Sequence, residues 1–94
     1  MLCGIQLSEA TQLHCTAYSY FDSLTASGTV PRVGICASDD LPFGTVVILP
    51  DGTQLVVEDR FGGGYRGRLD IFMATYDEAI NFGVRDLDCE IIYP

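Results

Sequence analysis

Basic residues, long apolar runs and metal-binding cysteine spacings are all scarce or missing in this chain of 94 residues. Only five lysines and arginines stand against 13 aspartates and glutamates, which gives a net charge of −8. Phosphate binding needs a basic surface, so nucleic acid is not an expected partner. An anionic membrane surface would likewise repel the chain.

No apolar run approaches the roughly 20 residues that a transmembrane helix needs. The first residues, Met1–Ile5, lack the basic region that opens a secretory signal peptide, and polar residues follow soon after. We therefore expect neither membrane insertion nor a signal peptide. A role outside the cell would then need another export route, or release when a cell lyses.

The cysteines do not form a zinc-binding pattern such as C-x2-C, so we predict no metal and no cofactor. The four cysteines are Cys3, Cys15, Cys36 and Cys89. They allow three disulfide pairings, among which the sequence does not choose. We expect free, partly buried thiols, as in a reducing compartment.

The length predicts one domain, and a hydrophobic content of 48% is high for so small a domain. Some apolar surface could be covered by a partner or by further copies of the chain. Alternation and turn residues predict short strands over 13–20, 32–37, 45–49, 53–58, 68–72 and 87–93. We expect residues 1–12 to form an N-terminal arm and residues 13–94 a compact, barrel-like β domain.

One short helix is expected at about 74–82. Thr75 and Glu78 have the spacing of a capping box, and Gly83 is a natural C-terminal stop. The helix should turn an apolar face inward. That face would consist of Ala79, Ile80 and Phe82.

The stretch 58–72 holds the candidate chemistry. Asp59 leaves one strand, Asp70 lies within the next, and four glycines and two arginines separate them. Glycines allow unusual backbone shapes and close approach of a ligand, so two aspartates around such a loop indicate a site for a polar substrate. The alternative is a tight turn that the aspartates cap, with Arg66 or Arg68 as ionic partners.

Four segments, in this order, resemble a known family. They are CTAYS (15–19), TASGTVPRVGICASDDLPFGT (25–45), VVEDRFGGGYRGRLDIF (56–72) and EAINFG (78–83). Together they are similar to the three-aspartate domain of the double-psi β-barrel superfamily. That domain is related to the barrel of MltA-type lytic transglycosylases and, more distantly, to RlpA-like proteins and expansins. The resemblance implies a mainly β fold, a small six-stranded double-psi β-barrel with one short α-helix.

The resemblance also implies roles for four aspartates. Asp70 corresponds to the catalytic acid/base and Asp59 to the family's second aspartate, while Asp39 or Asp40 falls on or near the first. We expect substrate contacts from loop hydroxyls, from aromatic rings that can stack on sugars and from one arginine. These candidates are Thr25, Ser27, Tyr18, Tyr65 and Arg68.

Two positions depart from the family pattern. The residues after Asp59 are Arg60-Phe61-Gly62 rather than the common Thr-Gly-Gly, and the Asp-Arg pair looks more like the RlpA branch. Ser38 stands at about the point where that branch carries a histidine. The large second domain of the MltA-type enzymes has no counterpart in these 94 residues.

The resemblance suggests a small module that cleaves peptidoglycan glycan strands as lytic transglycosylases do. A lone module of this kind suits a phage product, located in the virion or in the bacterial cytoplasm until lysis or infection. One alternative is a non-enzymatic virion protein, such as a head decoration, neck or tail component, that binds other phage structural proteins. A further alternative is an expansin-like module that binds glycan without cleaving it.

Overall fold

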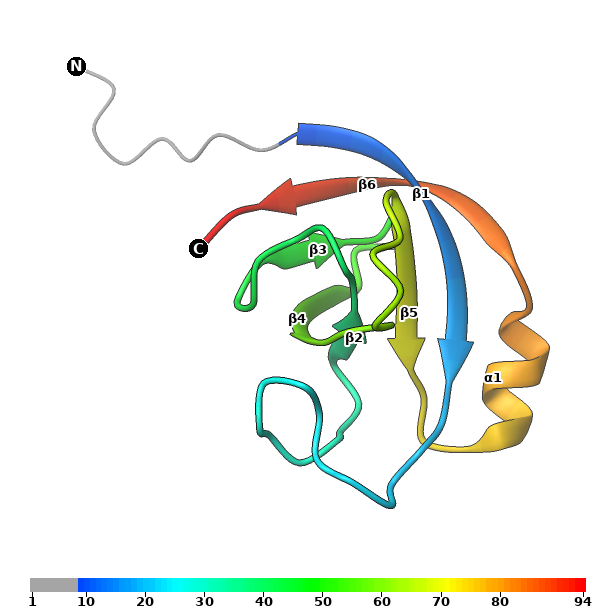
Figure 1. Ribbon diagram of the computed structural model, residues 1–94. Coiled ribbons are helices and arrows are strands. Elements are labelled where there is room, and N and C mark those ends of the chain that lie inside the picture. The colour runs from blue at the N-terminus through cyan, green and yellow to red at the C-terminus, as the bar shows by residue number, and fades with distance from the viewer. Residues whose placement is uncertain (1–8) are drawn as a thin grey trace.

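Six strands close into a barrel, and one short helix lies outside it (Figure 1). The structure is a computed structural model that describes residues 9–94. Its elements are β1 (Glu9–Tyr18), β2 (Ile35–Ala37), β3 (Val46–Ile48), β4 (Gln54–Asp59), β5 (Arg68–Phe72), α1 (Tyr76–Phe82) and β6 (Arg85–Ile92). The predicted mainly β fold, with a six-stranded barrel and one short helix, is therefore confirmed.

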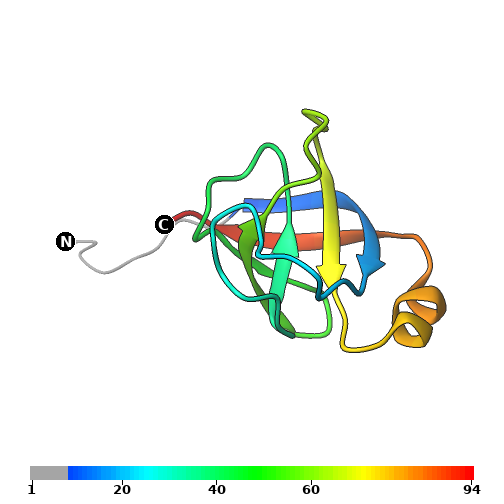
Figure 2. The same cartoon turned by 60° about the horizontal axis from the view of Figure 1, so that its bottom comes forward.

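The strands follow one another around the barrel in the order β1-β5-β2-β4-β3-β6, and β6 returns to β1. Two neighbouring pairs are parallel, β1 with β5 and β2 with β4, and the other pairs are antiparallel. Because β1 and β5 are parallel, their C-terminal ends lie at the same end of the barrel. The loop between β4 and β5 projects from the opposite end, away from α1 (Figure 2).

Alternate residues of the strands point into the barrel and form its core, as the period of a pleated strand requires. Buried apolar side chains come from every strand, with Val47, Val57 and Leu69 wholly inaccessible. The central cluster consists of Leu13, Cys15, Cys36, Leu41, Val47, Leu49, Leu55, Val57, Leu69, Ile71, Cys89 and Ile91. Residues between these positions face outward and are free to form a site.

Three of the four cysteines lie in this core as free thiols, as predicted. Burial raises the pKa of Cys15 to about 12, and the neighbouring Cys89 adds to the shift. Burial likewise raises the pKa of Cys36. A thiol must ionise to attack or to bind a metal, so these cysteines serve as small apolar core residues. Cys3 lies outside the described residues.

The strand bounds differ from the prediction where β1 and β6 meet. β1 begins at Glu9 rather than Leu13, and β6 begins at Arg85 rather than Leu87. The two strands pair without a break from Glu9 opposite Ile91 to Cys15 opposite Arg85. This ladder extends both strands into residues whose own sequence carries no alternation. Four residues expected in the N-terminal arm, 9–12, therefore belong to the barrel, and residues 1–8 lie outside the described part.

The caps of the helix are those predicted, but the prediction that Ile80 faces the core is wrong. The Thr75 hydroxyl accepts a hydrogen bond from the Glu78 N–H at 3.1 Å, and Gly83 ends the helix with a φ of 66°. Ala79 is buried and Phe82 packs against the core, whereas Ile80 remains 59% exposed. Only one narrow face of so short a helix meets the barrel. No helix within residues 9–94 has the length and apolar character needed to span a membrane.

Candidate functional site

A row of register partners crosses four neighbouring strands. Thr16 of β1 is the register partner of Asp70 of β5, and Asp70 is in turn opposite Ala37 of β2. Ala37 is also opposite Asp59 of β4. Two of the four candidate aspartates, Asp59 and Asp70, therefore lie on either side of one small alanine, with backbones two strand spacings apart, roughly 9–10 Å.

Asp59 reaches this row through an irregularity in the pairing of β2 with β4. Cys36 is opposite Val57, but the next residue, Ala37, is opposite Asp59, so Glu58 is an additional residue on β4. Such a bulge lets two consecutive side chains serve the same side of a sheet. Both Glu58 and Asp59 accept hydrogen bonds from the loop before β2.

Both oxygens of the Asp59 carboxylate accept hydrogen bonds. Its Oδ1 accepts from the backbone N–H groups of Ala26 and Arg60, each at 2.9 Å. Its Oδ2 accepts from the Tyr18 hydroxyl, also at 2.9 Å. Burial, followed by the hydrogen bond to Asp59, raises the pKa of Tyr18, so the phenol stays protonated and keeps donating. Tyr18, predicted to bind sugar, thus holds Asp59 in place.

Asp70 differs from Asp59 because only one of its oxygens is occupied. Oδ1 accepts a hydrogen bond from the Thr16 hydroxyl at 2.8 Å. Within residues 9–94, no hydrogen bond or ion pair reaches Oδ2. Burial raises the pKa of Asp70 above its ordinary value, and the charge of Asp59 adds to the shift, while the Thr16 hydrogen bond opposes it. A half-buried carboxyl that resists ionisation and has a free oxygen is suited to proton transfer.

The loop over residues 25–32 is anchored on Glu58. Both guanidinium nitrogens of Arg32 donate to this carboxylate at 2.6 Å, and the Thr29 hydroxyl donates at 2.7 Å. These donors lower the pKa of Glu58, with Arg32 as the largest cause and burial opposing. Thr25 is buried, and its hydroxyl lies 2.6 Å from that of Thr29, whereas Ser27 is exposed. Of the two predicted loop contacts, Ser27 is therefore the one that a ligand can reach.

Asp39 and Asp40 hold the glycine-rich loop and do not join the row. Asp39 accepts four backbone N–H groups at 2.8–3.1 Å, two on each oxygen. The donors are Phe61, Gly62, Gly63 and Tyr65. Asp40 accepts from the Gly67 N–H at 2.9 Å and from the Ser38 hydroxyl at 3.2 Å. Asp39 and Asp40 thus act as acceptors that fix the glycine-rich loop.

The pKa of Asp39 is lowered as a consequence. Desolvation raises it, but the four backbone donors together outweigh that effect. The aspartate thus remains ionised at neutral pH and acts as a permanent acceptor for the loop. A carboxylate that serves this many N–H groups is unsuited to proton transfer.

Tyr65 lies on the loop that Asp39 holds, and it contacts Arg68, the first residue of β5. The Arg68 guanidinium sits 4.8 Å from the Tyr65 ring centre, and the Phe61 ring packs edge-on at 5.6 Å. A Cβ on Gly63 would lie 2.5 Å from the Tyr65 ring, so this glycine leaves the space that the ring needs. Neither Arg66 nor Arg68 forms an ion pair with another residue in the described part of the chain.

Three sets of contacts around the candidate aspartates were not predicted from the sequence. Thr16 donates to Asp70, and Ala37 is the register partner of both Asp59 and Asp70. Arg60 donates to the Ser38 carbonyl oxygen at 2.8 Å and stacks on the Phe43 ring at 3.8 Å, which ties two loops together. The position of Thr16 two residues before Tyr18, on the same face of a strand, was the available signal.

No group of three or more histidine, cysteine or acidic side chains within residues 9–94 could hold a metal ion. Comparison of the chain with protein-family models, with curated proteins and with solved structures finds no match. The assignment of a function therefore depends on the residues and their geometry.

We predict that Asp39→Asn loosens the glycine-rich loop, because an amide nitrogen would face backbone N–H groups that now find a carboxylate oxygen. The melting temperature should fall by several degrees at neutral pH, and amide exchange should quicken over residues 61–65. Because the folded-state pKa is depressed, the loss should be present above the unfolded-state pKa and disappear as pH falls through the folded-state pKa. Equal melting and exchange in Asp39→Asn and in Asp88→Asn, an exposed aspartate of β6, would contradict this role.

The opposite sign is expected for Asp70→Asn. The raised folded-state pKa means that the folded protein binds the proton more tightly, so stability falls as pH rises between the two pKa values. At pH 7 the substitution should raise the free energy of unfolding modestly, because solvent screens a partly exposed group. The gain should shrink toward zero near pH ~3, below the unfolded-state pKa. Urea unfolding at both pH values measures it, and a gain no larger than that of Asp88→Asn would count against the assignment.

Proposed function

We propose that this barrel cleaves glycan strands of peptidoglycan in the manner of a lytic transglycosylase, with Asp70 as its single acid/base. One observation carries the proposal. Of the four candidate aspartates, only Asp70 has a carboxylate oxygen that no other group within residues 9–94 occupies. The other three are held by between two and four hydrogen bonds each.

Lytic cleavage suits one such carboxyl. Protonated Asp70 would give its proton to the glycosidic oxygen as the bond to the anomeric carbon breaks, and the bonding electrons leave with that oxygen. The resulting Asp70 carboxylate would then remove the proton from the sugar's own 6-hydroxyl, whose oxygen closes an anhydro ring on the anomeric carbon. This second step restores the protonated acid. A raised pKa favours both steps at moderate pH.

Asp59 has an electrostatic role in this proposal. Its three hydrogen bonds leave it unsuited to attack a sugar, but its charge raises the pKa of Asp70 and would stabilise positive charge at the anomeric carbon. A hydrolase with two working carboxyls would instead need both of them free, at a defined separation. Of the four candidate aspartates, Asp70 alone has an unoccupied carboxylate oxygen among residues 9–94, so the lytic reaction fits better.

The resemblance to the three-aspartate domain and to RlpA-like double-psi barrels supports this proposal. The four matching segments supply Asp70, Asp59 and the loops that surround them. A small module of this kind would act in a phage virion, or from the bacterial cytoplasm once lysis or infection gives access to the cell wall. Asp39 then contributes by fixing the loop that carries Tyr65.

Purified full-length chain should solubilise cell-wall sacculi and release sugars that end in an anhydro ring. Mass spectrometry identifies this ring, since each such end is lighter than a hydrolysed end by one water. Asp70→Asn should lower the release about 100-fold or more, although we expect this variant to fold at least as well as the parent. Asp88→Asn serves as the matched control. Intact sacculi with the parent chain, or full activity in Asp70→Asn, would overturn the proposal.

A non-enzymatic role in an assembly, such as a phage virion, is the second candidate, and a specific surface favours it. Tyr76 and Ile80, four residues apart on α1, are 71% and 59% exposed, and Val84, just beyond the end of the helix, is 64% exposed. Apolar side chains at this spacing share one side of a helix and commonly contact a partner.

Retention on sacculi without release of sugars would instead indicate an expansin-like binding module.

If this surface joins copies of the chain, light scattering after size exclusion should give a mass that rises with protein concentration. Ile80→Asp should return the mass to that of a monomer, whereas Glu90→Gln on β6 should not change it. A monomer at all concentrations, with no copies in purified phage particles, would remove this candidate.

A further inference from the structure

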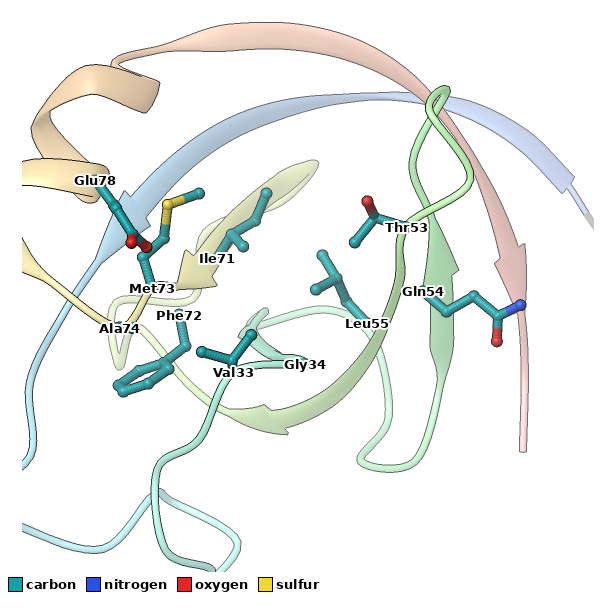
Figure 3. A pocket seen from close by; sticks show the side chains of 10 residues that line it. All are labelled: Val33, Gly34, Thr53, Gln54, Leu55, Ile71, Phe72, Met73, Ala74 and Glu78. Carbon is teal, nitrogen blue, oxygen red and sulfur yellow. The ribbon is translucent and has the colours of Figure 1, made fainter.

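A pocket of about 350 Å3 is lined by residues at the start of β4 and the end of β5, so it lies at the end of the barrel away from the glycine-rich loop. Its walls come from the residues before β2, the start of β4, the end of β5 and the first turn of α1. Figure 3 shows Val33, Leu55, Ile71 and Met73 surrounding the space, with Thr53 at its edge. This volume is at the lower end of the range for ligand sites, and the lining is mainly apolar, as such sites usually are.

One carboxylate stands at the rim. Glu78 in the first turn of α1 lines the pocket, and its carboxylate lies beside Met73 in Figure 3. The Glu78 backbone N–H is bound to Thr75, but no donor among residues 9–94 reaches the carboxylate itself. Arg32, next to Val33 in the sequence, is bound at 2.6 Å to Glu58, so it does not pair with the exposed Glu78.

We propose that this pocket binds a ligand with an apolar body and one terminal ammonium group. The apolar body would cover side chains such as Val33, which is 67% exposed, and the ammonium would pair with Glu78. The net charge of −8 attracts cations and repels anionic ligands of the same shape. Two sources share this chemistry, a free arylalkyl amine and a lysine side chain in a peptide, since lysine buries its methylene stem while its charge stays at the surface.

The pocket is separate from the proposed catalytic row. None of the four candidate aspartates lines it, and Ile71 of β5, which does, points to the opposite side of the strand from Asp70. Ligand binding therefore does not depend on whether the barrel cleaves glycan.

Amide chemical shifts of the full chain should be followed during titration with phenylbutylamine, phenylbutanol and phenylbutyrate. These probes differ in little but their end group. The amine should shift the amides of Val33, Leu55, Ile71 and Glu78, with a dissociation constant on the order of 1 mM. The alcohol should bind more weakly, and the anion should not bind. A capped peptide with one lysine, run alongside, shows by its relative affinity which source fits the pocket better.

Two variants and one control identify the contacts. Glu78→Gln should weaken amine binding about threefold to fivefold, as expected for one exposed ion pair. Thr53→Trp should abolish binding, because the indole would fill the space. Glu90→Gln, the same change on the far strand β6, should leave affinity unchanged. Equal affinity for amine and alcohol, or no shifts at about 10 mM amine, would overturn the proposal.

Discussion

Register between strands that are distant in the sequence is the constraint on which the site depends. β5 is paired on one side with β1 and on the other with β2, and both ladders place their partner residue beside Asp70. Because side chains alternate along a strand, a slip of one residue would turn Asp70 into the core and Ile71 outward. Closure of the barrel excludes that slip, since Leu69 and Ile71 fill its interior. Hydrophobic packing on the inside thus fixes the position of the carboxyl on the outside.

Three of the four candidate aspartates hold neighbouring segments of the chain by hydrogen bonds on both carboxylate oxygens, and Asp70 does not. Asp39 and Asp40 hold the loop between β4 and β5, and Asp59 joins the loop before β2 to Tyr18 of β1. Each satisfies its charge with hydrogen bonds and thereby stabilises the fold. Desolvation and the charge of Asp59 both raise the pKa of Asp70. The hydrogen bond from the Thr16 hydroxyl offsets only part of this effect. A group that destabilises the folded state slightly while remaining reactive is a common feature of functional sites.

Much of the fold could be predicted from the sequence because local signals agree with it. The Pro50-Asp51-Gly52 turn, the Thr75 cap and the alternating strands each indicate their own element. The extent of β1 and β6 could not be predicted, since a ladder between residues 70 to 82 positions apart sets it. The bulge that brings Asp59 beside Ala37 leaves no trace in the sequence, and neither does the role of Asp39 as an acceptor for a distant loop. Sequence spacing drew attention to four aspartates, but only the folded structure shows that Asp70 has an unoccupied oxygen while the other three are held by hydrogen bonds on both oxygens.

The most direct test of this account is a carbon-13 NMR titration of the aspartate carboxyl groups in the folded chain. The account predicts that Asp70 titrates above the ordinary range for aspartate and Asp39 below it. It also predicts that the pKa of Asp70 falls when Asp59 is replaced by asparagine, because a like charge is removed. A pKa of Asp70 at or below that of Asp39, or one indifferent to the charge of Asp59, would contradict the account.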